Sequence, residues 1–256
     1  MLNDQTIYNA AADRWWTDAP RWVRALHSMV PARLAWFDQF LDWKGADILD
    51  LGAAGGFMSE ALHDRGARVT GIDPAAQAIA AATAHARQTG RETIRYDVGV
   101  GEALPYQDRR FDAVVCVDVL EHVTDLAKVL AETARVLKPG GWFLFDTINR
   151  NPLARLVTVT LAERLLGVLP RGTHDPAMFI RPAELRVQLA AQGLAPGPMT
   201  GFGPVWIGAR GQLRFARLPG TAIMYMGAAR RTPAQKLPTR KSPAREQPTR
   251  KTPARG

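Results

Sequence analysis

Asp118, Glu121 and His122 place two carboxylates and an imidazole within one short segment that follows an apolar run. If the chain makes a helical turn here, their spacing of i, i+3 and i+4 puts all three on one face. Such a face can hold a divalent metal ion and leave coordination positions open for a substrate. Alternatively, His122 can act as a general base, because an imidazole with a pKa of ~6.5 exchanges protons near neutral pH. A turn that binds no metal is the remaining alternative.

A glycine-rich turn follows an earlier apolar run and contains Asp50, Gly52, Gly55 and Gly56. Glycine lets the backbone approach a ligand closely, because no Cβ stands in the way. The next apolar run ends at Asp73, whose carboxylate is placed to accept hydrogen bonds from ribose hydroxyls. This pattern suits a dinucleotide or S-adenosylmethionine. Asp50 favours the second, because a carboxylate repels a pyrophosphate and attracts ammonium and sulfonium charges. A glycine-rich turn without a ligand is the alternative.

Apolar runs that alternate with segments of helical spacing indicate the elements that position these residues. The expected strands are Ala46–Leu51, Arg68–Ile72, Thr93–Val98, Phe111–Val117 and Gly141–Thr147, and the helices include Ala75–Arg87 and Leu126–Leu137. Repeated strand–helix units predict an α/β fold with a doubly wound, mostly parallel sheet that binds its ligand at the carboxyl ends of the strands. Two weaker runs, near Gly197–Gly201 and Thr221–Gly227, complete a seven-stranded sheet as an antiparallel edge.

We expect three regions along the chain. Residues 1–45 form a helical cap, residues 46–228 form the sheet domain with an apolar insert at 153–169, and residues 229–256 form a basic, proline-rich tail. In the tail, Pro238–Arg245 returns almost unchanged as Pro248–Arg255. So few apolar side chains cannot offset the entropy lost on ordering, and we expect the tail to be disordered.

The net charge of +9 is concentrated in this tail. Nine basic residues and one acidic residue lie between Arg230 and Arg255, which leaves the rest of the chain close to neutral. The sheet domain therefore shows no charge excess for binding nucleic acid, and no nucleic-acid partner is expected. The tail either attaches to an anionic surface or has no role. The single cysteine, Cys116, allows no disulfide within the chain and fits a reducing compartment. No signal-peptide pattern is seen, and we expect a cytoplasmic location.

Two stretches resemble the S-adenosylmethionine-dependent methyltransferases of class I, which have a Rossmann-like sheet. One is the Leu-Glu-His turn at residues 120–122, and the other is Glu102-Ala103-Leu104-Pro105, which precedes Phe111-Asp112. The resemblance implies that Glu102 and Ala103 lie beside the adenine of the cofactor. A short surface loop is the alternative for the second stretch.

Segments after the fifth expected strand resemble one family more specifically. They are Asn149-Arg150-Asn151, Leu153–Leu169, Arg171–Asp175, Phe179–Leu185 and Tyr225-Met226, together with Arg14-Trp15-Trp16 near the start. On these segments the chain is similar to the ubiquinone-biosynthesis O-methyltransferases, which methylate hydroxyls of polyprenylated phenols and catechols. The likeness runs from Tyr8 to Met226.

The family resemblance implies a set of cofactor contacts. Arg33 reaches the methionine carboxylate, Gly52 supplies the turn, Asp73 holds the ribose, and Val117 contacts the adenosine. The chain departs from the family at Ala53-Ala54, where Cys-Gly is usual. The methyl group of Ala54 narrows the backbone approach to the cofactor, although the remaining glycines should preserve binding.

The resemblance also implies that Asp118, Glu121 and His122 bind Mg²⁺ or another divalent cation. Asp118 is one methylene shorter than the usual Glu, so its direct ligation is in doubt. A bound cation would acidify the acceptor hydroxyl. His174 is a second candidate for orienting the phenol, or it is a loop residue that fixes the apolar insert.

The insert at Leu153–Leu169 is aliphatic, with only Arg155, Glu163 and Arg164 charged, and is too short to span a bilayer. It is either an ordinary buried helix or, as the resemblance implies, a lipid-facing segment that holds the protein peripherally on an anionic membrane. Arg171 and the tail would add attraction to lipid headgroups.

The leading hypothesis is therefore an S-adenosylmethionine-dependent O-methyltransferase acting on a polyprenyl phenol or catechol. One alternative is the same fold methylating another phenolic small molecule, at oxygen or at carbon. Another is a non-catalytic cofactor-binding or lipid-accessory protein, which the departures at Ala53-Ala54 and Asp118 would fit. A nucleic-acid methyltransferase is disfavoured, since no Pro-Pro-Tyr-type base-flipping loop is present.

Overall fold

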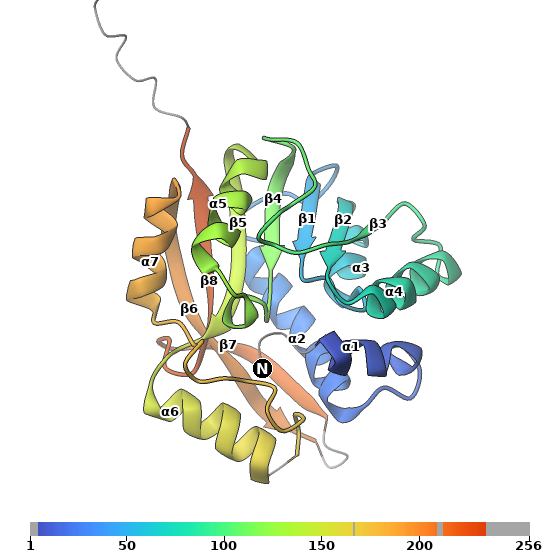
Figure 1. Cartoon of the computed structure of the whole chain (residues 1–256), viewed down its shortest axis with the longest axis vertical. Helices are drawn as coiled ribbons and strands as arrows, with labels where there is room; N and C mark the ends of the chain where they lie inside the picture. Colours follow the sequence, from blue (N-terminus) through green and yellow to red (C-terminus); the bar gives the residue numbers. More distant parts are fainter. Residues whose placement is uncertain (1–4, 166, 209–211, 234–256) are drawn as a thin grey trace, which may run out of the picture.

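The computed structural model describes residues 5–165, 167–208 and 212–233, and shows helices packed on both faces of one β-sheet (Figure 1). Within these residues eight strands are hydrogen-bonded in the order β3-β2-β1-β4-β5-β8-β6-β7. The parallel strands are β1 (Asp47–Leu51), β2 (Arg68–Asp73), β3 (Arg95–Val98), β4 (Phe111–Cys116) and β5 (Leu137–Ile148). The antiparallel strands are β6 (Leu194–Ile207), β7 (Leu213–Leu218) and β8 (Met224–Arg231).

The predicted α/β sheet is confirmed, but the expected seven strands are wrong by one, because β7 was not recognised. Its sequence, Leu-Arg-Phe-Ala-Arg-Leu, lacks strict alternation of apolar and polar residues. β6 is longer than the predicted run at Gly197–Gly201, since prolines and glycines resemble loop residues in a sequence. The strand tolerates them where its register with β8 shifts, between Pro196 and Met199. β5 begins at Leu137 rather than at the predicted Gly141, and its register with β4 shifts near this start.

Neighbouring residues of the central strands point to opposite faces of the sheet and so build two cores. Ile48 packs with Phe37 of α2 (Arg21–Phe37) and with α3 (Phe57–His63). Leu49, the next residue of β1, packs with Leu130 of α5 (Leu126–Val136) and with α7 (Pro182–Ala191). Helix α4 (Ala76–Gln88) contacts β2 and β3. This arrangement leaves the carboxyl ends of the parallel strands open to the segments described next.

The N-terminal segment consists of α1 (Gln5–Ala11), a 3₁₀ turn (Ala12–Arg14) and α2, and it lies across the carboxyl ends of the first strands. Trp15 is buried there, with its ring against those of Trp22 and Phe57. These elements fall within the residues predicted as a helical cap, and their aromatic rings pack together.

The apolar insert folds as α6 (Pro152–Arg155), which continues directly into the π-helix η3 (Leu156–Leu165) at one end of the molecule (Figure 1). Asn151 caps α6, since its Oδ1 accepts the N–H of Ala154 at 2.8 Å. None of the helices in the described ranges is long and apolar enough to cross a bilayer.

The segment predicted as tail begins inside β8, because that strand continues to Arg231. The guanidinium of Arg230 lies 5.3 Å from the ring centre of Trp142, and Arg231 donates to the carbonyl of Arg135 at 3.0 Å. Both arginines therefore belong to the sheet. The repeat from Pro238 to Arg255 lies outside the described residues, and its disorder stays a prediction.

Candidate active site

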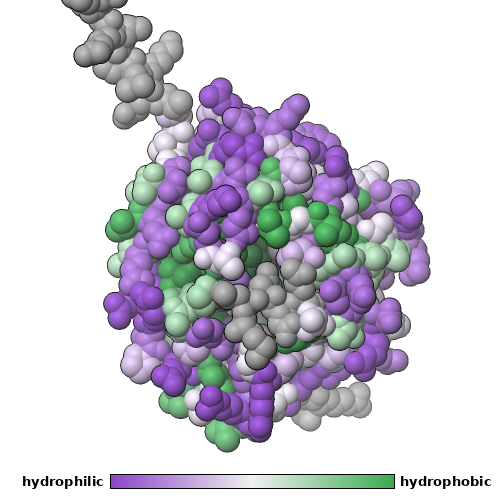
Figure 2. Space-filling model, viewed as in Figure 1, coloured by the Kyte–Doolittle hydropathy of each residue, from purple (hydrophilic) through white to green (hydrophobic). Residues whose placement is uncertain are grey.

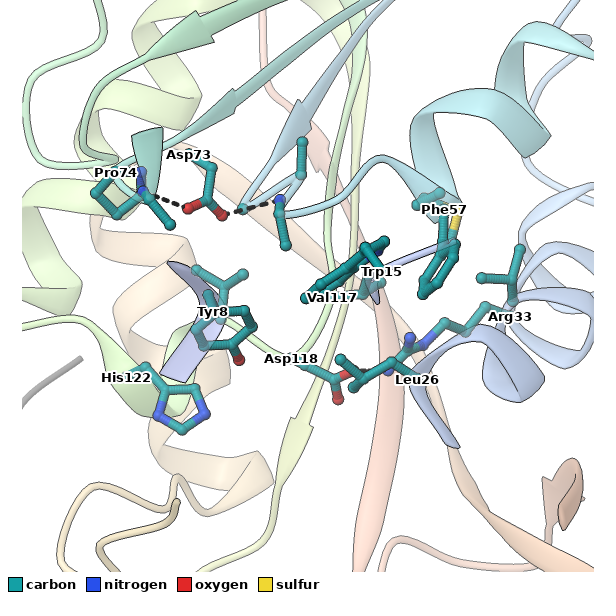
Figure 3. Close-up of a pocket in the computed structure, with 17 residues that line it drawn as sticks. Tyr8, Trp15, Leu26, Arg33, Phe57, Asp73, Pro74, Val117, Asp118 and His122 are labelled. Atoms are coloured by element: carbon teal, nitrogen blue, oxygen red, sulfur yellow. Dashed lines mark hydrogen bonds and ion pairs between the residues drawn. The ribbon is translucent and has the colours of Figure 1, made fainter. Parts of the chain in front are cut away.

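A cavity opens at the carboxyl ends of β1, β2 and β4, where the strand order reverses between β1 and β4 (Figure 3). Ligands of doubly wound sheets bind at this reversal. Four of the residues predicted to hold the cofactor line the cavity, namely Arg33, Gly52, Asp73 and Val117. The structure thus brings together residues from α2, from the end of β2 and from the loops after β1 and β4.

Asp73 is fixed at the end of β2 by two backbone amides. Its Oδ2 accepts the N–H of Ala54 at 3.0 Å, and its Oδ1 accepts the N–H of Ala75 at 2.8 Å (Figure 3). Burial raises the pKa of this carboxyl, while the two amide hydrogen bonds act in the opposite direction. The side chain is therefore an oriented acceptor at the wall of the cavity, as binding of ribose hydroxyls requires.

The glycine turn approaches its neighbours too closely for larger side chains. A Cβ on Gly52, which has φ of +84°, would lie 2.1 Å from Val119 Cγ2. A Cβ on Gly55 would lie 1.9 Å from Trp15 Nε1. Ala54 takes φ of +43° although it carries a Cβ. Ala54, which stands where the resemblance leads us to expect glycine, therefore strains the backbone of the turn.

Four other predicted cofactor residues are not among the described residues that line the cavity: Asp50, Gly55, Glu102 and Ala103. Asp50 lies fully buried beneath the turn, and its Oδ2 accepts the hydroxyl of Ser59 at 2.6 Å. Glu102 accepts the hydroxyl of Thr124 at 3.0 Å, on the loop after β3. Burial of Asp50 raises the pKa of its carboxyl to about 7. Asp50 therefore supports the turn from below.

Arg33 is bonded to two carboxylates, one on β5 and one in the loop after β4. Its Nη2 lies 2.5 Å from Asp118 Oδ2, and its Nε lies 2.5 Å from Asp146 Oδ2. The other oxygen of Asp146 accepts the backbone N–H of Asp118 at 2.8 Å. Burial alone would lower the pKa of Arg33, but the two carboxylates outweigh it and raise the pKa. The guanidinium is thus neutralised by the protein's own acids.

Glu121 and His122 are brought together with His174, and Asp118 is not part of this group. One ligand atom from each of the three residues lies within 4.8 Å of the others. Asp118 takes φ of +53°, and only a 3₁₀ turn (Leu120–His122) follows it. The helical face expected from the i, i+3, i+4 spacing therefore does not form, and the carboxylate of Asp118 contacts Arg33 instead. Whether these residues bind a metal stays a prediction.

Two members of this group, Glu121 and His174, each have a partner that orients the side chain and leaves one atom available. Thr147 donates its hydroxyl to Glu121 Oε2 at 2.9 Å. His174 Nδ1 lies 2.9 Å from Oε1 of buried Glu163, which frees Nε2 of the imidazole. A carboxylate behind an imidazole is the usual support of a histidine metal ligand. The donor set therefore fits a divalent cation.

The protonation of the group is set by burial. Burial and the nearby carboxylate of Asp118 raise the pKa of Glu121 to about 8. Burial and the neighbouring imidazole of His174 lower the pKa of His122 to about 4. His122 is therefore neutral at pH 7, as metal ligation requires, and is a weak base for a phenol with a pKa of ~10.

A second, largely apolar cavity meets the first one. It extends between α2, the insert α6–η3 and the β6–β7 hairpin, and His174 lies in its wall. Four residues line both cavities, and these are Tyr8, Leu26, Asp118 and His122. A reactive group held in the first cavity can therefore meet an apolar molecule held in the second at this junction.

Sequence reasoning missed three residues of the site: Tyr8, Asp146 and Glu163. A signal existed for Asp146, because an acid in the buried run Phe143–Thr147 needs a charged partner. Glu163 stood out only as a charge in an aliphatic insert. Tyr8 belongs to no motif, and its role depends on where α1 packs.

Comparison with known proteins places this geometry among methyltransferases. Residues 49–145 match the model of a family described as a methyltransferase domain. The chain is 38% identical over 236 residues to a protein of Paracidovorax citrulli (strain AAC00-1) named ubiquinone biosynthesis O-methyltransferase, covering 89% of this chain and 94% of that protein. A protein of the same name from Azotobacter vinelandii (strain DJ / ATCC BAA-1303) is 43% identical over 196 residues, covering 76% of this chain and 84% of that protein.

Solved structures share the fold at low sequence identity. A protein of Thermotoga maritima described as an S-adenosylmethionine-dependent methyltransferase, possibly a histamine N-methyltransferase, has a TM-score of 0.61 at 16% identity, covering 89% of this chain and 99% of its own. An S-adenosylmethionine-dependent methyltransferase of Aquifex aeolicus has a TM-score of 0.61 at 16% identity, covering 90% of this chain and 99% of its own. These likenesses show the fold alone.

Proposed function

Because the chain belongs to the family of ubiquinone biosynthesis O-methyltransferases, we propose that it transfers a methyl group from S-adenosylmethionine to a hydroxyl of a polyprenylated phenol or catechol. The observation that carries this proposal is the junction of the two cavities at Asp118 and His122. The first cavity combines the charged side chains of Arg33 and Asp73 with apolar residues beside the glycine turn, which suits the cofactor. The second has the apolar wall that suits a ring with a hydrocarbon chain.

The residues of the first cavity support binding of the cofactor. Asp73, oriented by two amides, would accept the ribose hydroxyls, and Val117 would contact the adenosine. Arg33 would hold the methionine carboxylate with the N–H groups that Asp118 and Asp146 do not use. Bound S-adenosylmethionine supplies an activated methyl group, so the protein has to align and ionise the acceptor oxygen.

The junction residues would perform this alignment. The apolar wall of the second cavity excludes water, which strengthens every electrostatic interaction near the acceptor oxygen. His122 presents a neutral imidazole to both cavities and can orient the acceptor hydroxyl by a hydrogen bond. His174, whose ring is stacked on that of His122 in the wall of the second cavity, can do the same.

We also propose that Glu121, His122 and His174 hold a divalent cation. The set of one carboxylate and two imidazoles suits a transition-metal ion or Zn²⁺ better than Mg²⁺, which prefers oxygen ligands. Such an ion would lower the pKa of a hydroxyl bound to it. The support for this proposal is the orientation of His174 by Glu163 and of Glu121 by Thr147.

Peripheral association with an anionic membrane is proposed from the surface around the second cavity. Leu153, Leu156 and Leu165 of the insert are exposed, and Figure 2 shows hydrophobic residues on this part of the surface. Arg155, Arg164 and Arg171 are also exposed here, and among the described residues none of them forms an ion pair. Apolar side chains beside unpaired arginines suit the boundary between headgroups and acyl chains.

The activity is tested by methyl transfer to a farnesylated catechol, with the non-prenylated catechol as the matched acceptor. The apolar cavity predicts that the prenylated acceptor has a kcat/KM at least about tenfold higher, because several buried CH₂ groups contribute ~0.8 kcal/mol each. Equal rates on both acceptors would favour a soluble phenolic substrate. Methylation at a ring carbon, identified by NMR of the product, would contradict O-methylation. Binding of S-adenosylmethionine without turnover on any phenol would favour the accessory-protein alternative.

A further inference from the structure

Tyr8 is the aromatic residue that lines both cavities where they meet. Its ring is held edge-on against Trp22, with ring centres 5.5 Å apart, and lies 6.1 Å from the ring of Trp15. The next residue, Asn9, accepts the N–H of Gln77 at 3.0 Å and so fixes α1 to the start of α4. The ring of Tyr8 is therefore placed by two tryptophan rings and by the attachment of its helix to α4.

The hydroxyl of Tyr8 faces the space between His122 and Asp118 in Figure 3. Within the part of the chain that the structure describes, no group is hydrogen-bonded to this hydroxyl. A phenol of ordinary pKa keeps its proton at neutral pH, and burial together with the nearby carboxylates of Asp118 and Asp73 raises the pKa of Tyr8 further. Tyr8 thus offers a hydrogen-bond donor at the junction.

The other residues of the junction offer few hydrogen-bond donors for an oxygen bound there. Leu26 has no polar group, and the carboxylate of Asp118 can only accept hydrogen bonds and repels a negative oxygen. His122 is the other junction residue whose side chain can donate a hydrogen bond, through a ring N–H. A phenolate generated at this point therefore depends on His122 and Tyr8 for hydrogen bonds from the protein.

We propose that the hydroxyl of Tyr8 donates a hydrogen bond to the acceptor oxygen and stabilises it as the phenolate that attacks the methyl group, an inference that rests on the proposed function. The oxygen–carbon bond forms as the carbon–sulfur bond breaks, and the sulfonium becomes a neutral thioether. The proton of the acceptor phenol passes to solvent, and Tyr8 keeps its own proton. Tyr8 is then a residue of the reacting centre supplied by the N-terminal segment.

The test compares Tyr8→Phe with the wild-type protein on two acceptors, a farnesylated catechol and its ring-nitrated analogue, which is already ionised at neutral pH. Tyr106→Phe is the matched control, because the hydroxyl of Tyr106 bonds to Asp97 at 2.9 Å and Tyr106 lines neither cavity. S-adenosylhomocysteine affinity is measured by calorimetry for all three proteins. It reports both folding and the integrity of the cofactor site.

We expect Tyr8→Phe to lower kcat/KM about 10- to 100-fold for the farnesylated catechol, as the loss of one charge-assisted hydrogen bond predicts. For the nitrated acceptor, kcat/KM should fall less than about threefold, because its oxygen is a weaker base and gains less from the hydrogen bond of Tyr8. S-adenosylhomocysteine affinity and both activities of Tyr106→Phe should stay within about twofold of wild type.

Equal losses on the two acceptors would overturn the inference, because they would reveal a packing role for the ring. A parallel loss of S-adenosylhomocysteine affinity would also overturn it, by making Tyr8 a cofactor ligand. Both results leave the proposed function intact as long as the wild-type protein methylates the farnesylated catechol. Failure of the wild-type protein on every acceptor would overturn the proposed function and this inference together.

Discussion

Oδ2 of Asp146 lies 2.5 Å from Nε of Arg33, and both side chains are buried, with Asp146 on the interior strand β5. Asp118 bonds to the same guanidinium, so Arg33 would already be neutralised before it met the cofactor carboxylate that we propose it binds. Three carboxylates around one guanidinium repel each other unless one of them takes up a proton. Asp146 is suited to do so, because burial raises the pKa of its carboxyl. Binding of the cofactor carboxylate should thus be coupled to protonation of this buried acid.

Replacing Asp146 by Asn should destabilise the fold, because it leaves a buried guanidinium with one charged partner instead of two. We expect the free energy of unfolding, measured by chemical denaturation, to fall by about 2–4 kcal/mol. Asp108→Asn is the control, since Asp108 pairs with Arg135 in an exposed position, where such a pair contributes less than about 1 kcal/mol. Similar losses in both variants would contradict the structural role given to Asp146.

Asp50→Asn should make stability less dependent on pH. Burial raises the pKa of the Asp50 carboxyl to about 7 in the folded protein, so the native state binds a proton that the unfolded chain releases above its normal pKa. The free energy of unfolding therefore falls as pH rises from about 4 to about 7, by at most about 4 kcal/mol from this group. Asp50→Asn should be more stable than the wild-type protein at pH 8, and the difference in their free energies of unfolding should vanish near pH 4.

Asp47→Asn is the control for Asp50→Asn, because Asp47 lies on the same strand and the pKa of its carboxyl is shifted in the opposite direction. Hydrogen bonds from Arg68 and Lys138 lower the pKa of Asp47. Its carboxylate stabilises the fold above its normal pKa, and that contribution is lost as pH falls through the folded pKa. Asp47→Asn should therefore be slightly less stable than wild type at neutral pH. A loss of stability in Asp50→Asn at pH 8 would contradict the assignment of Asp50 as a buried acid.

Ala54→Gly should stabilise the turn by about 1 kcal/mol, because glycine adopts a φ of +43° without the steric penalty that a Cβ carries. Ala53→Gly is the matched control one residue earlier. Ala53 is buried, and a Cβ on Gly71 would lie 2.9 Å from its methyl group. Removing that methyl should destabilise by about 1 kcal/mol. Thermal unfolding that ranks the two variants in the reverse order would show that the methyl of Ala54 has a packing role.

Two of the predicted residues that line the cavity have positions that follow from the backbone. Gly52 and Asp73 end consecutive parallel strands, and such strand ends meet in any doubly wound sheet. Asp118 was different, because its assignment assumed a helical turn. The chain adopts a positive φ there, and Arg33 from a distant helix takes the carboxylate. Spacing within one segment gives no information about such a partner.

The rest of the site depends on how distant segments pack. His174 joins Glu121 because the loop after the insert folds back over the junction, and Glu163 bonds to both the side chain and the backbone of His174. The strand β6 was predicted only in part, because its prolines and glycines carry loop propensity that neighbouring strands override. Tertiary contacts of this kind leave no periodic signal in a sequence.

Glu121→Gln and His174→Ala should each weaken binding of a divalent transition-metal ion about 10- to 100-fold in calorimetry, since each removes a ligand of the proposed cation. Asp118→Asn should bind the ion nearly as wild type does, because the structure directs Asp118 to Arg33. The affinity of the wild-type protein should rise with pH up to about 8, since Glu121 has to lose its proton. A loss in Asp118→Asn equal to that in Glu121→Gln would restore the ligand set that the family resemblance implied.

The last prediction concerns the surface proposed to contact a membrane, which has two parts at one end of the molecule. Leu165 of the insert is 69% exposed, and Trp206 and Ile207 near the end of β6 are 54% and 62% exposed. The insert and the β6–β7 hairpin line the same apolar cavity, so a polyprenyl chain could enter between them directly from a bilayer. Large apolar side chains gathered at such an entrance suit insertion among lipids.

Leu165→Ser and Trp206→Ser should each weaken flotation with liposomes that contain anionic phospholipid, by about tenfold, as the loss of ~1–2 kcal/mol of apolar contact predicts. Val187→Ser is the matched control, because Val187 is 71% exposed on α7, away from the cavity entrance (Figure 1). High salt should reduce binding of every variant by screening Arg155, Arg164 and Arg171. If Val187→Ser lost as much binding as Trp206→Ser, the entrance would have no special contact with lipid, because any exposed apolar residue would then act alike.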